Sequence, residues 1–316
     1  MRKTIIFSLI TLVAAAMLFG GCGNVGRNVH INEKDISAFD SVHVNVSSAN
    51  IEFTASDRYG LEIFVPERYR PEWDVTNGQL TIYERTGGFR FVPHFSFSKC
   101  YVKVYYPVGA EFHDISLRSS SGNIEFSETA VSDLNITASS GAVYAKAEKC
   151  ASAYIKTKSG DVKLSGSVDD VDISTSSGAV RSDTSGSGAI RAITRSGSVT
   201  LGCEGDRPAA LNVSTSSGSI RADGAVWRDV RTTTRSGSTE IRGELSGDTY
   251  VKTSSGDVKL SVSGDPSQYG YSLTPSSGSI HWDGMKMGKP ARSSGSFENN
   301  ITVDTSSGGI RVDFSK

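Results

Sequence analysis

The sequence predicts an all-β fold, a single-stranded parallel β-helix (β-solenoid) with coils of about 19 residues. Three observations lead to this prediction. A Ser-Gly string recurs at steady spacing, apolar residues alternate on both sides of it, and no sustained helical period follows the N-terminal segment. The strings include TSSGAVRS from residue 175, TRSGSVTL from 194 and TSSGSIRA from 215.

The glycine of each Ser-Gly pair marks one repeat. Successive glycines lie 18 to 22 residues apart, except for a last interval of 30 residues. They are Gly122, Gly141, Gly160, Gly178, Gly197, Gly218, Gly237, Gly256, Gly278 and Gly308. Such a period indicates stacked repeats, and we expect successive repeats to pair in parallel.

Each repeat is expected to contain two short strands joined at the Ser-Gly corner. In one repeat the inward positions are Ala153, Ile155, Thr157, Ser159, Val162 and Leu164. The parity of this alternation changes at the glycine, so the chain must turn there, and a glycine tolerates the positive φ that tight corners often need. Inward Thr and Ser hydroxyls are expected to hydrogen-bond to neighbouring coils.

The solenoid is expected to span residues 38–316, with degenerate N-terminal coils over 38–112 and regular Ser-Gly repeats over 113–316. The stretch VHVNVSSANIEF has the same register with Ala49 at the corner, and WDVTNGQLTI repeats it around Gly78. These segments therefore extend the same rod and do not form a separate domain.

The layout FDSVHVNVSSANIEF, then NGQLTI, VKVYYPVGAEFHDISLRSSSGNIEF and a series of SSG corners resembles the bacterial "putative adhesin" family. The resemblance covers roughly residues 38 to 316. It implies an exported β-solenoid at the cell envelope and carries over no catalytic residues.

The N-terminus is typical of an export signal. A basic start is followed by an apolar run to Phe19 and by Gly-Gly-Cys. We expect residues 1–21 to be a lipoprotein signal peptide, Cys22 to carry the lipid, and residues 22–37 to be a short tether to the membrane. The alternative is ordinary cleavage with an unlipidated Cys22. If Cys22 carries the lipid, three cysteines remain, an odd number that cannot all pair, and we interpret them as buried apolar residues: Cys100, Cys150 and Cys203.

Composition and motifs argue against an enzyme and against nucleic-acid binding. The chain has 33 basic and 34 acidic residues, whereas nucleic-acid binding domains are typically basic. We find no catalytic motif, no cofactor motif and no metal-ligand spacing among the five histidines. Corner aspartates such as Asp133, Asp170, Asp229 and Asp248 are interpreted as turn caps. A polysaccharide lyase or hydrolase on the same fold remains the alternative.

Two surface features are candidate binding sites. Stacked repeats would align basic residues into a stripe that an anionic glycan could follow, or that only keeps the strands soluble. These residues are Lys158, Lys163, Arg181, Arg195, Arg221, Arg235 and Lys259. The second feature is an aromatic loop that could contact sugars or a membrane, or cover an end of the solenoid. It contains Phe89, Phe91, Phe95 and Phe97.

The predicted function is that of a non-catalytic, membrane-anchored envelope lipoprotein whose repetitive surface serves adhesion or envelope scaffolding. Its expected partners are the membrane, through the lipid, and an envelope polysaccharide or surface protein. The alternative is a self-assembling envelope module, since the chain ends with IRVDFSK directly after a repeat, and an open edge expected there would allow end-to-end self-association.

Overall fold

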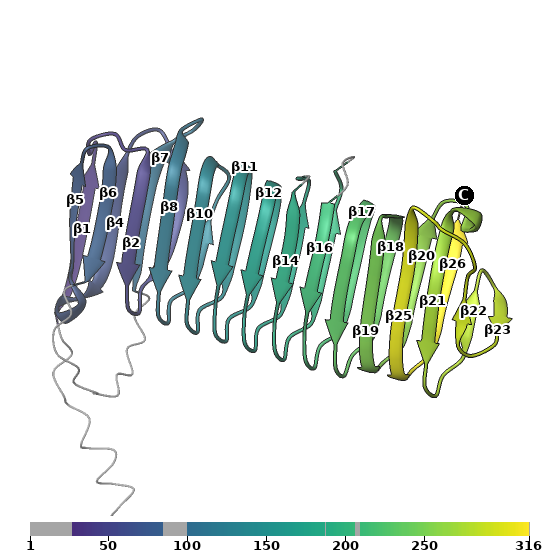
Figure 1. The fold of residues 1–316 in the computed structure, drawn as a ribbon. Helices are drawn as coiled ribbons and strands as arrows, with labels where there is room; N and C mark the ends of the chain where they lie inside the picture. Colours follow the sequence, from purple (N-terminus) through teal and green to yellow (C-terminus); the bar gives the residue numbers. More distant parts are fainter. Residues whose placement is uncertain (1–26, 85–99, 187, 206–208, 316) are drawn as a thin grey trace, which may run out of the picture.

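The computed structural model describes residues 27–84, 100–186, 188–205 and 209–315. The described chain is all-β and forms an elongated, solenoid-like rod (Figure 1). Two short 3-10 helices interrupt the strands, η1 (Glu67–Tyr69) and η2 (Pro266–Gln268). The predicted all-β class is therefore confirmed.

The strands lie on two faces. Face A contains the strands that lead into the Ser-Gly corners, and face B contains the strands that leave them. In stacking order, face A consists of β5 (Pro71–Thr76), β6 (Gln79–Glu84), β2 (Ser41–Val46), β8 (Glu111–Ser119), β10 (Ala130–Ala138), β11 (Val143–Lys156), β12 (Val162–Ser174), β14 (Ala189–Ile193), β16 (Ala209–Ser214), β17 (Ile220–Thr234), β19 (Asp248–Ser255), β25 (Asn299–Ser307), β21 (Tyr269–Pro275) and β24 (Ala291–Arg292).

Face B begins at the same end of the rod. It consists of β1 (Asn28–Lys34), β4 (Gly60–Pro66), β7 (Tyr101–Pro107), β3 (Asn50–Ser56), β9 (Ile124–Phe126), the first parts of β11 and β12, β13 (Val180–Thr184), β15 (Val199–Cys203), the first part of β17, β18 (Thr239–Ser246), β20 (Val258–Ser263), β26 (Ile310–Ser315), β22 (Ile280–Trp282) and β23 (Met285–Met287).

Successive repeats pair in parallel through the middle of the rod, as predicted. Val162 of β12 lies opposite Val180 of β13, and Val180 lies opposite Val199 of β15. We call the two strands of one repeat, with their corner, a rung. Inward side chains of both faces fill one core that runs along the rod, including Ile173 and Leu164, each with no exposed surface.

The corner glycines are required for a reason that differs from the prediction. None of them has a positive φ. Instead, a Cβ atom on Gly197 would lie 1.9 Å from the carbonyl oxygen of Gly178 in the neighbouring rung. The same overlap occurs between Gly178 and Gly160. The glycines therefore allow close backbone contact between rungs, and the expectation of positive φ is wrong.

A buried threonine three residues before the glycine completes this corner. The Oγ1 atom of Thr215 accepts a hydrogen bond from the amide of Gly218 at 3.1 Å and donates to the carbonyl of Gly197 in the previous rung, also at 3.1 Å. Thr194 makes the same two contacts with Gly197 and Gly178. Each such hydroxyl therefore fixes its own corner and joins it to the previous one, as expected for inward hydroxyls.

The N-terminal end departs from the chain order. The rung made by β2 and β3 lies between the β6–β7 rung and the β8–β9 rung. The outermost rung at this end is therefore β6 with β7, although it follows β2 and β3 in the chain. Antiparallel strands cover this end, β5 on face A and β4 and β1 on face B. Residues 28–34 form β1, so their assignment to a tether is wrong.

The C-terminal end is threaded in the same way. The last rung, β25 and β26, lies between the rung of β19 and β20 and the rung of β21 and β22 (Figure 1). The expected open edge at the last strand is therefore wrong, because β26 has a partner on each side. The terminal edges are the short strands β23 and β24, which pair antiparallel with β22 and β21.

Candidate functional site

The structure divides the predicted basic stripe into two rows. Four residues, Lys163, Arg181, Arg221 and Lys259, point outward from face B, and we call them the face row. The other three, Lys158, Arg195 and Arg235, lie at the Ser-Gly corners, and we call them the corner row. The two rows differ in their charged neighbours.

The face row is aligned but not continuous. Lys163 lies opposite Arg181, Arg181 lies opposite Thr200, and Thr200 lies opposite Arg221. Glu240 then separates Arg221 from Lys259. An uncharged residue and an acid therefore interrupt the predicted run of positive charge.

Acids two residues further along the same strands pair with the two arginines of the face row. The Nε atom of Arg181 lies 3.0 Å from Asp183, and that of Arg221 lies 2.8 Å from Asp223. Arg221 also contacts Glu240 at 2.9 Å. Residues two apart on a strand point to the same side of the sheet, so this pairing follows from strand geometry.

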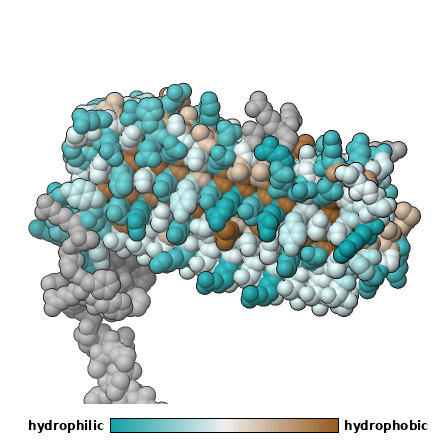
Figure 2. Space-filling model, viewed as in Figure 1, coloured by the Kyte–Doolittle hydropathy of each residue, from teal (hydrophilic) through white to brown (hydrophobic). Residues whose placement is uncertain are grey.

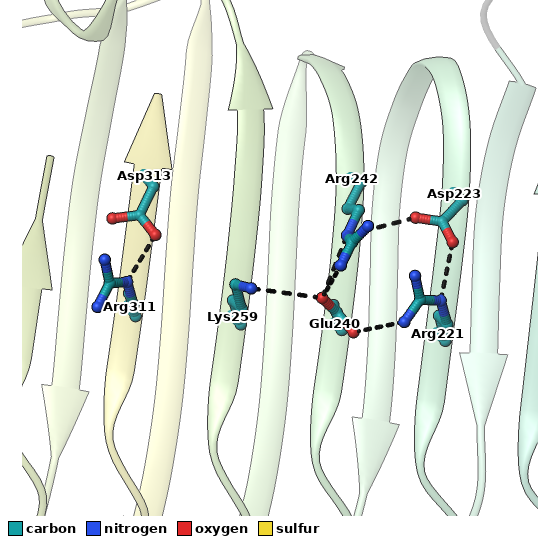
Figure 3. Close-up of polar contacts among 7 residues, drawn as sticks. All are labelled: Arg221, Asp223, Glu240, Arg242, Lys259, Arg311 and Asp313. Carbon is teal, nitrogen blue, oxygen red and sulfur yellow. Dashed lines mark hydrogen bonds and ion pairs between the residues drawn. The ribbon is translucent and has the colours of Figure 1, made fainter. Parts of the chain in front are cut away.

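Figure 3 shows how the pairing extends toward the C-terminal end. Glu240 lies 2.7 Å from Arg242 and 3.6 Å from Lys259, and Arg311 lies 2.6 Å from Asp313. The hydrogen bond from Arg242, opposed by partial burial, lowers the pKa of Glu240, while the pKa values of Arg242 and Arg311 are raised chiefly by their bonds to Glu240 and Asp313. Apart from Lys163, for which no carboxylate lies within 4.0 Å among the described residues, the face row is charge-compensated.

The corner row follows a ladder of backbone hydrogen bonds. The amide of Ser176 donates to the carbonyl of Lys158, and the amide of Arg195 donates to that of Ser176. The amide of Ser216 donates to the carbonyl of Arg195, and the corner that contains Arg235 lies on the next rung after Ser216. The three cations therefore project from every second rung, with a serine between each pair.

These corner cations are exposed and uncompensated. In the part of the chain that the structure describes, none of Lys158, Arg195 and Arg235 has a carboxylate within 4.0 Å. The corner segments 174–179, 193–198, 214–219 and 233–238 contain no acidic residue. A ligand can therefore approach Arg195 and Arg235 without displacing an existing ion pair.

Aspartates at the opposite corner act in several ways. Asp170 accepts a hydrogen bond from the amide of Ala189 at 2.8 Å, which fits the predicted role as a cap between rungs. Asp229 adopts a positive φ of 48°. Asp114 and Asp133 lie opposite each other on β8 and β10, and burial, with the Asp133 charge second, raises the pKa of Asp114.

A carboxylate surrounded by aromatic residues lies on face B at the N-terminal end. Glu62 accepts hydrogen bonds from Tyr101 at 2.7 Å and Tyr105 at 3.1 Å, and contacts His30 at 2.9 Å. The Tyr101 bond is the largest cause that lowers the pKa of Glu62, and burial opposes it. Sequence reasoning missed this cluster because antiparallel pairing of β4 with β7 joins residues that share no repeat position.

The remaining predicted residues are placed as follows. Cys150 and Cys203 are buried thiols, and burial raises the pKa of Cys150 to about 11. Cys100 is half-buried, and its thiol pKa is raised by burial and then by Glu84. Cys22 and the aromatic loop of Phe89, Phe91, Phe95 and Phe97 lie outside the described residues.

A metal centre and a membrane span have no counterpart among the residues described. Across residues 27–315, apart from the undescribed gaps, His, Cys, Asp and Glu side chains do not gather into a group of three that could hold a metal ion. Within the same ranges, no helix reaches the length and apolar character needed to cross a membrane.

Three solved structures of bacterial proteins are similar over most of their length. A "putative adhesin" from Parabacteroides distasonis is 15% identical, with a TM-score of 0.40, covering 92% of this chain and 98% of its own. One from Bacteroides fragilis is 13% identical, with a TM-score of 0.34, covering 90% and 97%. A "putative lipid binding protein" from P. distasonis is 14% identical, with a TM-score of 0.32, covering 93% and 98%.

Family membership rests on the sequence pattern as a whole. No curated protein matches the chain. The Toastrack family, DUF4097, matches residues 39–313, which is nearly the whole predicted solenoid, so the predicted family resemblance over residues 38 to 316 is confirmed. The chain belongs to the Toastrack DUF4097 family.

Proposed function

We propose that this protein is a non-catalytic envelope lipoprotein whose rigid rod presents a repeated surface for adhesion or scaffolding. In this proposal the rod is a single-stranded parallel β-helix whose two ends are rethreaded. The observation that carries the proposal is the register of the rungs, since residues at one repeat position lie side by side along the rod. Many weak, equally spaced contacts with one polymer then add through effective concentration.

The proposed attachment is at the N-terminus. Residues 1–21 are the export signal and Cys22 carries the lipid, while β1 begins at Asn28. The tether is therefore short, and the antiparallel end of the rod stands close to its membrane. Metabolic labelling with a fatty-acid analogue tests this step, with label expected on the native protein and none on Cys22→Ala. Label retained by that variant would contradict lipidation at Cys22.

The polymer partner is tested on a glycan array. The solenoid without its signal is expected to bind at least one envelope polysaccharide and to leave its length unchanged on long incubation. Shortening of the bound polymer would instead identify a lyase or hydrolase. Failure to bind any glycan on the array would contradict the adhesion proposal.

A further inference from the structure

The Ser-Gly corners form a continuous edge along one side of the rod, at the bottom of Figure 1, where the face A strands turn toward face B. Figure 2 shows this lower edge mainly in colours of intermediate hydropathy, interrupted by hydrophilic residues. Two corner positions per rung carry mostly serine, as in the exposed pairs Ser176 with Ser177 and Ser254 with Ser255. The edge therefore displays hydroxyl groups at the spacing of the rungs.

We propose that this edge binds a linear anionic polysaccharide through the corner row, Lys158, Arg195 and Arg235. The proposal rests on the adhesion function proposed above and assigns it to one surface. Adjacent strands lie about 4.8 Å apart, so cations on every second rung recur at about 10 Å. A polymer with one anionic group per disaccharide or a longer repeat matches such a row better than one that is charged at every sugar.

Charge compensation distinguishes this edge from face B. An anion approaching Arg181 or Arg221 competes with Asp183 and Asp223, which already lie within 3.0 Å of them. Arg195 and Arg235 have no such competitor in the described chain, and both are exposed. Among the described residues, all three corner cations therefore lack a competing acid, whereas in the face row only Lys163 does, so the corners give the more favourable field for an anion.

The neighbouring groups suit a sugar chain. Between the cations, Ser176 is exposed and Ser216 is half-buried, and serine hydroxyls both donate and accept hydrogen bonds to sugar hydroxyls. A membrane surface is a weaker fit, because interfacial binding also needs apolar side chains that insert, and the four corner segments from 174 to 238 contain no aromatic residue.

Two triple variants with the same change in net charge test the assignment. The corner variant is Lys158→Gln, Arg195→Gln and Arg235→Gln, and the face variant is Arg181→Gln, Arg221→Gln and Lys259→Gln. The probe is hyaluronan, with one carboxylate per disaccharide, and polygalacturonate, glycerol-phosphate polymer and uncharged dextran are compared with it. Circular dichroism and thermal unfolding of each variant establish that it is folded.

The expected result is that the native protein binds hyaluronan more tightly than dextran, with affinity that falls as salt rises. Loss of three exposed ion pairs weakens binding of the corner variant about tenfold, and the face variant stays within about twofold, because its arginines are already engaged. Binding to the glycerol-phosphate polymer with the same dependence on the corner row also supports the proposal and identifies phosphate as the anion.

Several outcomes would overturn the proposal. Equal weakening in both variants would show that only net charge matters. Tighter binding to polygalacturonate than to hyaluronan would contradict the spacing argument. Binding to vesicles with anionic lipids, but to none of the three anionic polymers, would show that the edge docks on membranes. Binding to neutral glycans alone would overturn this assignment and leave the adhesion function standing, whereas no binding to any glycan would overturn both.

Discussion

The middle of the rod and its two ends differ in the order and the direction of their strands. From Gly160 to Gly256 the rungs stack in chain order, all pairs are parallel, and one threonine-glycine corner recurs. At both ends the rungs are out of chain order, because the β6–β7 rung lies outside the β2–β3 rung and the β21–β22 rung lies outside the β25–β26 rung. Antiparallel strands cover each outer rung. A repeat can therefore define the middle of a solenoid while leaving the order of its terminal rungs open.

The two ends also differ in the length of their edge strands. Edge strands expose unpaired backbone groups that invite association. At the C-terminal end the outer strands β23 and β24 are three and two residues long, whereas at the N-terminal end β1 and β5 have seven and six residues. The C-terminal core beneath is covered by packed rings, with Trp282 at 4.3 Å from Tyr271 and 5.0 Å from Phe314 between centroids.

The largest expected effect comes from the corner glycines of the middle. Gly197→Ala places a Cβ atom against the carbonyl of Gly178, which cannot move without separating two rungs. We expect a loss of about 3 kcal/mol in the free energy of unfolding, measured with denaturant. The control is Gly288→Ala at the C-terminal end, where a Cβ atom meets no atom within 4 Å. Equal stability of the two variants would contradict the close-contact argument.

Buried threonines of the middle should respond in opposite directions. Thr215→Val removes a hydroxyl with two backbone partners and should cost about 2 kcal/mol. The Thr232 hydroxyl is fully buried and has no hydrogen-bond partner among the described atoms, so Thr232→Val should stabilise the protein by about 1 kcal/mol. Thermal unfolding of both variants measures the difference. A loss of stability in both would show that the second hydroxyl has a partner.

The smallest effect is expected at the N-terminal end, through Glu62. Its pKa in the folded protein is lowered from 4.5, mainly by Tyr101. Its contribution to stability is therefore fully present above pH 4.5 and is lost as the pH falls through the lower folded value. In acid, the hydrogen-exchange protection factors of β1, which correct for the intrinsic pH dependence of exchange, should fall while those of β13 stay high. Glu62→Gln should remove this pH dependence, and an unchanged acid response would contradict it.

The repeat unit could be predicted because its signals are local. Alternation places Val162 and Leu164 inward, and the steady interval places Val162 beside Val180. The reason for the corner glycine could not be predicted from a single turn, because the constraint comes from a carbonyl oxygen in the neighbouring rung and not from a positive φ. The charge pairing of Arg181 with Asp183 could have been predicted, since residues two apart on a strand share a face.

The terminal rungs could not be ordered from the sequence. Strand β26 has the same alternation as β20 and β22, and any of them can pair beside any other. The outermost rung is covered by β23 and β24, and these strands, with three and two residues, are too short to be recognised in the sequence. The Glu62 cluster could not be predicted either, because it depends on antiparallel strand pairing at the end of the rod, which does not follow the repeat of about 19 residues.

The threading of the last rung is the most direct test of this architecture. Lys259 lies opposite Arg311, and Arg311 separates it from His281. Under mild oxidation, the double variant Lys259→Cys with Arg311→Cys should form a disulfide, as should the control Lys163→Cys with Arg181→Cys on neighbouring rungs in the middle. The pair Lys259→Cys with His281→Cys should remain reduced. A disulfide between 259 and 281, with 259 and 311 left reduced, would contradict the account.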